Sequence, residues 1–187
     1  LKEAGLPEGW CQSVICENDV AEKLITDWRI NYFSFIGSAK VGWYLSTKLS
    51  AGTRYALEHG GAAPVIVEPD ADFTEMMPAL AKGGFYHAGQ VCVSVQRIFA
   101  HESICNKVAN ELSLLARKLK VGDPMNPETE IGPLILPREV DRVEEWVNEA
   151  IEAGAEILCG GKRISDTCFE PTVLLNPPAD VRVSTME

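Results

Sequence analysis

Residues 30–42, INYFSFIGSAKVG, decide how this chain folds. The aromatic-rich stretch 30–36 favours a β-strand, and the segment from Gly37 onward has the pattern of a helix that carries Gly42. A strand that runs through Gly-Ser into a helix leaves free backbone N–H groups at the helix N-terminus, and these attract phosphate. Gly37 allows a ligand to approach closely, and Ser38 can cap the helix or donate a hydrogen bond. Taken alone, such a motif is more often an ordinary strand-to-helix turn, here capped by Ser38.

The alternation of strands and helices continues through the rest of the chain. Strands that alternate with long helices indicate an α/β protein with a mostly parallel sheet. The Pro- and Gly-rich stretch 122–137 is expected to form an ordered surface loop. The predicted strands are 12–16, 30–36, two within 55–69 separated by Gly60 and Gly61, 93–100, 156–161 and 169–176, and the predicted helices are 19–27, 37–53, 70–89, 101–124 and 137–154.

Length, charge and cysteine usage exclude several classes of protein. The 187 residues suffice for one domain, or for parts of two, with a hydrophobic core. The formal net charge is -10, so nucleic acid and anionic membranes are poor partners. No apolar run approaches the roughly 18 residues of a membrane span, and no signal peptide is visible, so we expect a soluble protein. The six cysteines have neither C-x-x-C nor zinc-like spacing, so we expect reduced thiols, no metal site and a cytoplasmic setting.

The stretch LEHGG, residues 57–61, places a carboxylate at the end of an apolar strand. Sites form at the strand ends of parallel sheets, and a carboxylate with apolar neighbours can act as a general base. Glu58 is therefore a candidate base. A solvated or paired glutamate at a turn explains the same residues.

The stretch AGQVC, residues 88–92, ends in the most suggestive of the cysteines. Two small residues free space around Cys92, and a thiol near backbone N–H groups can be ionised and attack a carbonyl. A buried structural cysteine is the commoner occurrence. A cysteine–histidine hydrolase or esterase is a further alternative, because His87 precedes Cys92 by five residues.

Taken together and in this order, the three motifs resemble those of the aldehyde dehydrogenase family. FIGSAKVG resembles the family's glycine motif, LEHGG resembles its Leu-Glu-Leu-Gly-Gly motif, and FYHAGQVC resembles the cysteine motif, which has Gly-Gln before the nucleophile. The spacing of Glu58 and Cys92 also fits. Further similar stretches, PVIVEPDAD, RIFAHES, VGDP with IGPLI, GAEILCGGKR and FEPTVL, extend the resemblance over essentially the whole chain.

The resemblance implies oxidation of an aldehyde to a carboxylate with NAD or NADP. Cys92 would attack the aldehyde as a thiolate, and its backbone N–H would hold the oxyanion. Glu58 would activate the water that hydrolyses the resulting thioester. Gly37 and Ser38 would lie at the pyrophosphate of the cofactor.

The same resemblance assigns the other cofactor residues and suggests a substrate. Val41 and Gly42 would flank the adenine end. His59 replaces the leucine usual in the family, where the backbone carbonyl contacts the nicotinamide amide; that contact survives the substitution, but the histidine adds a titrating group. The AGQVCVSV neighbourhood is similar to that of members acting on small hydroxyaldehydes such as lactaldehyde or glyceraldehyde derivatives.

The resemblance also implies a parallel-sheet, aldehyde dehydrogenase-like fold within a longer protein. Residues 1–61 would be the C-terminal part of a Rossmann-like coenzyme-binding domain, and residues 62–187 an incomplete catalytic domain. The parent protein would be a homo-oligomer, either a dimer or a tetramer. The chain by itself would then bind no cofactor and turn over no aldehyde.

Overall fold

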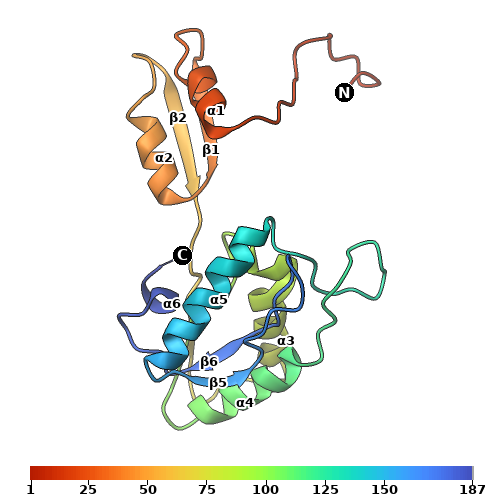
Figure 1. Cartoon of the computed structure of the whole chain (residues 1–187), viewed down its shortest axis with the longest axis vertical. Helices are drawn as coiled ribbons and strands as arrows, with labels where there is room; N and C mark the ends of the chain where they lie inside the picture. The colour runs from red at the N-terminus through yellow and green to blue at the C-terminus, as the bar shows by residue number, and fades with distance from the viewer. Residues whose placement is uncertain (187) are drawn as a thin grey trace. The chain divides into compact units, whose positions relative to one another are not determined.

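The computed structural model of the chain describes residues 1–186 and divides into two compact units. The first unit is Leu1–His59, and the second begins at Gly60 (Figure 1). Helices and strands occur in both, so the predicted α/β class is confirmed. Among the described residues, two of the three strand pairs are parallel, in keeping with the expected parallel pairing, and each contains only two strands.

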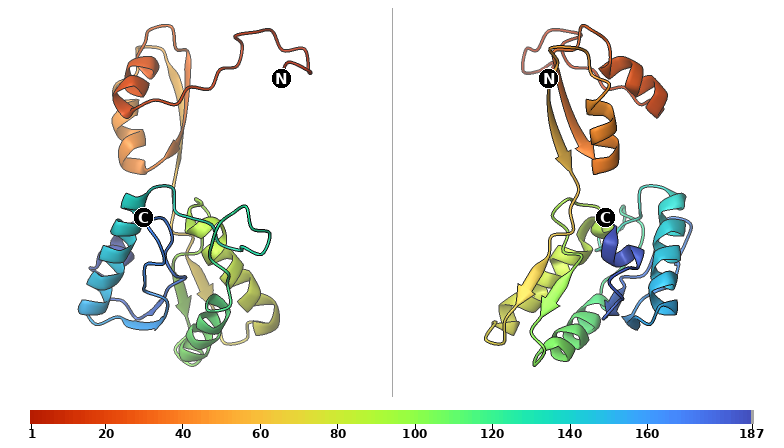
Figure 2. Two further views of the ribbon diagram at one scale, coloured as in Figure 1. Left: turned by 45° about the vertical axis from the view of Figure 1, so that its right-hand side comes forward. Right: turned by 90° about the vertical axis from the view of Figure 1, so that its left-hand side faces the viewer.

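The first unit is built on two parallel strands with helices on one face. Its elements are α1 (Asn18–Ile25), β1 (Tyr32–Gly37), α2 (Ala39–Ser46) and β2 (Arg54–His59). The register sets Gly37 of β1 opposite His59 of β2. Both helices lie on the same side of the strand pair (Figure 2). Helix α2 ends earlier than predicted because the hydroxyls of Ser46 and Thr47 donate back to carbonyls of the preceding turn.

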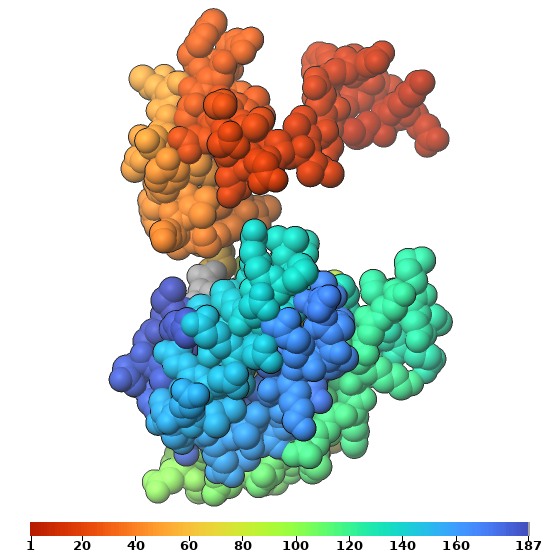
Figure 3. Space-filling model, in the orientation of Figure 1, coloured from red at the N-terminus to blue at the C-terminus, as the bar shows by residue number. Residues whose placement is uncertain are grey.

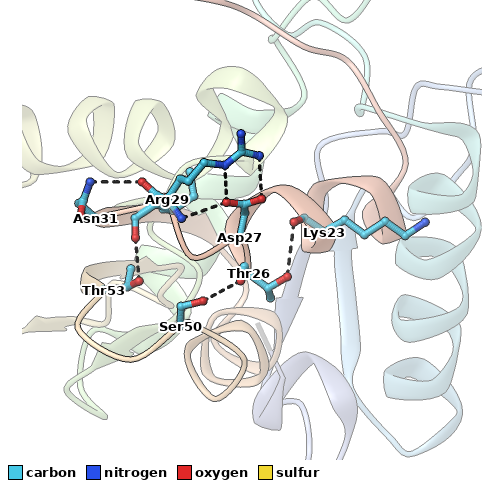
Figure 4. A network of polar contacts seen from close by, with 8 residues as sticks. Lys23, Thr26, Asp27, Arg29, Asn31, Ser50 and Thr53 are labelled. Atoms are coloured by element: carbon cyan, nitrogen blue, oxygen red, sulfur yellow. Dashed lines mark hydrogen bonds and ion pairs between the residues drawn. The ribbon is translucent and has the colours of Figure 1, made fainter.

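A polar network fixes the turn that leads from α1 into β1 (Figure 4). The Arg29 guanidinium donates to both carboxylate oxygens of Asp27, at 2.8 and 2.9 Å, and the Arg29 backbone N–H donates to the same group at 2.9 Å. Two hydroxyls from the segment before β2 donate to carbonyls near this turn, both at 2.8 Å: Ser50 to Thr26 and Thr53 to Ile30. These bonds connect the entrance of β1 to the entrance of β2, so they help to fix the strand register.

The strand predicted at 12–16 is wrong. The structure has no strand there, and the apolar side chains of Val14 and Ile15 are exposed. The Gln12 side chain donates to the Gly9 carbonyl at 3.1 Å, within a local turn. A short apolar run becomes a strand only where a neighbouring strand satisfies its backbone and a packed layer covers its side chains. The described residues supply neither to this segment.

The second unit packs around helix α4. Its elements are β3 (Val65–Val67), α3 (Phe73–Phe85), the 3-10 helix η1 (Tyr86–Gly89), β4 (Ile98–Ala100), α4 (Cys105–Ala116), α5 (Pro137–Glu152), β5 (Glu156–Cys159), β6 (Val173–Leu175) and α6 (Arg182–Thr185). Strands β3 and β4 are parallel, whereas β5 and β6 are antiparallel. Helix α4 buries Val108, Leu112 and Ala116 in a core that includes side chains of α3, β3, β5 and β6.

Several elements of the second unit are shorter than the sequence predicts. The strand expected at 93–100 is reduced to β4, because the N–H groups of Ser94 and Val95 donate to Val91 and Gly83 instead of to a neighbouring strand. The helices expected at 70–89 and 101–124 end at Phe85 and Ala116. Helix α6 was not predicted, since four residues are too few to show a helical period.

The stretch 122–137 forms an ordered loop before α5, as predicted. The N–H of Gly122 donates to the carbonyl of Ile131 at 3.0 Å, and Glu130 and Ile131 donate to the carbonyl of Lys120 at 2.8 and 3.0 Å. Ile131 is buried, so the loop has an apolar anchor. Its outer residues form part of the surface of the second unit (Figure 3).

We predict that Asp27 titrates in strong acid. The hydrogen bonds from Arg29 lower the pKa of the Asp27 carboxyl from 3.8 to about 2. Since the folded-state pKa lies below the unfolded value, the pair stabilises the protein fully above pH 3.8 and loses this effect as the pH falls through about 2. A carboxyl NMR titration should show this midpoint in the native chain and a return toward 3.8 in Arg29→Ala. Arg54→Ala, a control in the same unit, should leave it unchanged, and an ordinary midpoint in the native chain would show that the pair does not form.

Candidate active site

Cys92 lies on a tight turn of the second unit. The N–H of Ser94 donates to the carbonyl of Val91 at 2.9 Å and closes a β-turn with Cys92 and Val93 at its centre. Cys92 is exposed. Among the hydrogen bonds of the described residues, the N–H groups of Cys92 and Val93 have no acceptor. A thiol beside free backbone N–H groups is the arrangement that a nucleophile and an oxyanion require.

The backbone before this turn is strained. His87, Ala88 and Gly89 have φ values of 51°, 55° and 73°, so three successive residues are left-handed. For a residue with a Cβ atom this conformation costs roughly 1–2 kcal/mol. We call residues 87–89 the left-handed reversal. Surrounding contacts must hold this reversal in place, and strain of this kind concentrates at functional sites.

A buried serine anchors the turn to the end of α3. Ser94 is 0% exposed, and its hydroxyl lies 3.2 Å from the carbonyl oxygens of both Gly83 and Gly84. The N–H of Val95 donates to the Gly83 carbonyl at 3.0 Å. A Cβ at Gly84 would lie 3.2 Å from the Val95 carbonyl oxygen, so the absence of a side chain permits the close approach. The end of α3 thus fixes where Cys92 stands.

Glu58 lies near the C-terminal end of β2 in the first unit, beside Ile36 of β1. It is exposed, and its carboxylate has neither a hydrogen-bond donor nor an ion-pair partner among the described residues. Such a carboxylate is free to accept a proton from water. Glu58 belongs to the first unit and Cys92 to the second.

His59 turns its ring onto helix α2. The ring centroid lies 5.4 Å from that of Trp43 in an edge-to-face arrangement. Its Nε2 is buried and has no hydrogen-bond partner among the described residues. A Cβ on Gly42 would lie 2.5 Å from this nitrogen, so the glycine makes the space that the histidine occupies. This steric role of Gly42 could not be predicted from the sequence, because only the packing of β2 on α2 reveals it.

The N-terminus of α2 keeps free donors. The Ser38 hydroxyl caps the helix weakly, with its Oγ 3.5 Å from the N–H of Val41. The N–H groups of Ala39 and Lys40 have no acceptor among the described hydrogen bonds. Gly37, at the end of β1, leads directly into this turn. The arrangement is a capped turn, and it also suits an anionic group.

Two alternatives, Cys159 as the nucleophile and a Cys92–His87 pair, have little support in the structure. Burial raises the pKa of the Cys159 thiol, which keeps it protonated. The ring of His87 packs against that of Tyr86, with centroids 5.1 Å apart. No hydrogen bond among the described residues joins the His87 ring to Cys92. The pair that a cysteine–histidine hydrolase needs is therefore not formed in this structure.

Residues 1–186 contain neither a candidate metal cluster nor a helix that could span a membrane. No group of three or more His, Cys, Asp or Glu side chains in this range could hold a metal ion. None of the helices in this range is both long and apolar enough to cross a bilayer.

The second unit of this α/β protein thus presents an exposed cysteine on an anchored turn. The chain belongs to the aldehyde dehydrogenase family, whose sequence profile matches residues 1–187. The 3-sulfolactaldehyde dehydrogenase of Priestia megaterium is 41% identical over 189 residues, which cover 100% of this chain and 39% of that protein. The chain thus spans well under half the length of this relative.

Solved structures agree with this assignment. The NAD-dependent aldehyde dehydrogenase from Sinorhizobium meliloti matches with a TM-score of 0.91 and 33% identity, over 98% of this chain and 37% of that one. The glyceraldehyde-3-phosphate dehydrogenase GapN from Methanocaldococcus jannaschii, complexed with NADP, matches with a TM-score of 0.79 and 41% identity, over 83% of this chain and 34% of that one. The expected aldehyde dehydrogenase-like fold is therefore confirmed.

We expect His59→Leu to increase the free energy of unfolding by about 1 kcal/mol. A buried polar atom without a partner costs roughly 1–3 kcal/mol, and leucine can occupy the space over Gly42 without one. His101→Leu is the matched control, because His101 Nδ1 lies 2.9 Å from the hydroxyl of Ser103 and would lose a partner. Urea unfolding of both variants gives the comparison. Destabilisation by His59→Leu would mean that the histidine ring is satisfied in solution.

Proposed function

We propose that the full-length protein oxidises an aldehyde to a carboxylate with NAD or NADP, using Cys92 as nucleophile. The observation that carries the proposal is the exposed Cys92 on a turn whose central N–H groups are free. Membership of the aldehyde dehydrogenase family supports the reaction class.

In the first half of the reaction, the Cys92 thiolate attacks the carbonyl carbon of the aldehyde. A C–S bond forms, and one electron pair of the C=O bond moves onto oxygen. The free N–H of Cys92 donates a hydrogen bond to this oxyanion and lowers the barrier. Departure of a hydride from carbon restores the carbonyl and leaves a thioester on Cys92.

The N-terminus of α2 is the proposed binding site for the cofactor. The free N–H groups of Ala39 and Lys40 suit a pyrophosphate, and the weak cap leaves Ser38 available to it. When bound, the nicotinamide supplies the acceptor for the hydride. The residues proposed to contact the cofactor are Gly37, Ser38, Val41, Gly42 and, through its backbone carbonyl, His59.

Glu58 is the proposed base for the second half. Its unpaired carboxylate takes a proton from a water molecule, whose oxygen attacks the thioester carbon. The C–S bond then breaks, which releases the acid and regenerates the Cys92 thiolate. Transfer to a thiol such as coenzyme A needs no such base, so Glu58 favours hydrolysis.

The proposed substrate is a small hydroxyaldehyde such as lactaldehyde. Two similar proteins carry the names of 3-sulfolactaldehyde and glyceraldehyde-3-phosphate dehydrogenases. The residues that flank the nucleophile, Val91 and Val93, are uncharged, and Val93 is exposed. Any anionic substituent on the substrate must therefore be recognised by residues outside this turn.

We also propose roles for the two parts of the chain. Residues 1–61 would belong to the coenzyme-binding domain and residues 62–187 to the catalytic domain of a cytoplasmic homo-oligomer. A chain that spans 39% of a relative's length supplies only part of a site, so we expect no turnover from these residues alone. The division into units near residue 60 supports the separate roles.

In the full-length protein, Cys92→Ala should abolish aldehyde oxidation, and Glu58→Gln should slow the steady state by 100-fold or more. A general base contributes about 10²–10⁴-fold to rate, and the amide that replaces the carboxylate could not accept the proton. Glu58→Gln should still give a rapid burst of NADH or NADPH, because the thioester forms before the base acts. Stopped-flow absorbance measures the burst and the steady state together.

Exposed residues of the same types supply the controls. Cys16→Ala and Glu68→Gln should behave as wild type, since both residues are exposed and lie outside the proposed site. Turnover that survives Cys92→Ala would exclude the proposed nucleophile. Loss of the burst in Glu58→Gln would place Glu58 in the first half of the reaction.

A further inference from the structure

The side-chain amide of Gln90 is nearly saturated with hydrogen bonds, although the residue lies on the surface. Its Nε2 donates to the carbonyl of His87 at 3.1 Å and to the carbonyl of Pro133 at 3.3 Å. Its Oε1 accepts from the N–H of Ile135 at 2.9 Å. Three of the four bonds available to an amide are thus made, all with backbone groups.

These bonds join two segments that lie far apart in the sequence. The bond to His87 closes the left-handed reversal, where the Gln90 N–H also donates to His87 at 3.1 Å. The bonds to Pro133 and Ile135 join this reversal to the end of the loop before α5. That loop is held from its other side, because the N–H of Leu134 donates to the carbonyl of Thr167 at 2.8 Å. Gln90 therefore connects a strained segment to an anchored one.

We propose that Gln90 is a positioning residue for the nucleophile, a role that rests on the proposed function of Cys92. Ser94 fixes the C-terminal side of the Cys92 turn through α3, and Gln90 fixes the N-terminal side through the loop. With both sides held, the free N–H of Cys92 keeps one direction relative to the thiol. Misplacement of a reacting group by about 1 Å can cost 100-fold in rate, so a device of this kind affects catalysis more than stability.

We call the three side-chain hydrogen bonds of Gln90 the clamp, and its chemistry requires an amide. The carbonyls of His87 and Pro133 accept hydrogen bonds, whereas the N–H of Ile135 donates one, and glutamine supplies both functions in one side chain. Gln90→Glu retains the acceptor for Ile135 and places a carboxylate against two carbonyl oxygens. Gln90→Ala removes all three contacts. Gln90→Glu therefore keeps one of the two loop contacts, that with Ile135, while it loses the bond that closes the reversal.

Amide hydrogen exchange of the full-length protein tests the contacts directly. In Gln90→Ala, exchange at the hydrogen-bonded N–H groups of Ser94 and Ile135 should accelerate at least tenfold, while that of the α4 core stays unchanged. In Gln90→Glu, Ile135 should stay protected, and Ser94 should exchange faster. The matched control is Gln12→Ala, because Gln12 Nε2 also donates to the carbonyl three residues earlier, at 3.1 Å, far along the chain from the site.

Steady-state kinetics test the consequence. Gln90→Ala should lower kcat at least tenfold with KM for the aldehyde changed less than threefold, and Gln12→Ala should match wild type. A variant that exchanges faster throughout the second unit and keeps kcat per folded molecule would show a purely structural role and overturn the proposal. Gln90→Ala equal to Gln12→Ala in both measurements would overturn it as well.

Failure of the proposed function gives a different pattern. If Cys92→Ala retains turnover, Cys92 is not the nucleophile, and the positioning role falls with it whatever the exchange data show. If Cys92→Ala is inactive while Gln90→Ala keeps wild-type kcat, only the role of Gln90 is refuted. Iodoacetamide labelling of Cys92 adds a readout independent of turnover, and its rate should change at least threefold in Gln90→Ala.

Discussion

The contact of the buried Ser94 hydroxyl with the last carbonyls of α3 is the interaction on which the candidate nucleophile depends. A helix end presents carbonyl groups without intrahelical partners, and here Ser94 and the N–H of Val95 satisfy them. Because the N–H of Val95 serves the helix and the N–H of Ser94 closes the turn to Val91, neither can extend strand β4, which starts only at Ile98. The chain between them is left to form the turn that presents Cys92. A shortened strand and an exposed thiol thus have one cause.

In the first unit, too, the packing of one residue leaves its neighbour exposed. The His59 ring lies over Gly42 and beside Trp43, where its Nε2 has no partner among the described residues. This packing joins the end of β2 to α2 while the neighbouring Glu58 stays exposed and unpaired. Since side chains alternate along a strand, the inward direction of His59 sets the outward direction of Glu58. A histidine at position 59 therefore affects the face of β2 that packs on α2, and not the face that carries Glu58.

Much of the fold could be predicted from the sequence, because hydrophobic period and capping residues act locally. The strand–turn–helix at 30–46 and the helix from Pro137 follow from such local patterns. The lost strand at 12–16 and the shortened strand at 93–100 depend on which backbone groups find partners far along the chain, and no local pattern shows this. Glu58 and Cys92 could be named from motif order, whereas the clamp by Gln90 required the loop that ends at Ile135.

The most direct test of whether the anchored turn activates Cys92 compares three exposed cysteines. Cys11, Cys16 and Cys92 are all exposed, so each can react with limiting iodoacetamide, and an activated thiol reacts first. Mass spectrometry of the full-length protein at pH 7 gives the three rates in one experiment. We predict that Cys92 reacts at least tenfold faster than the other two and is protected by a saturating aldehyde. Equal rates at the three positions would contradict this prediction, since the anchored turn would then do nothing for the thiol that it presents.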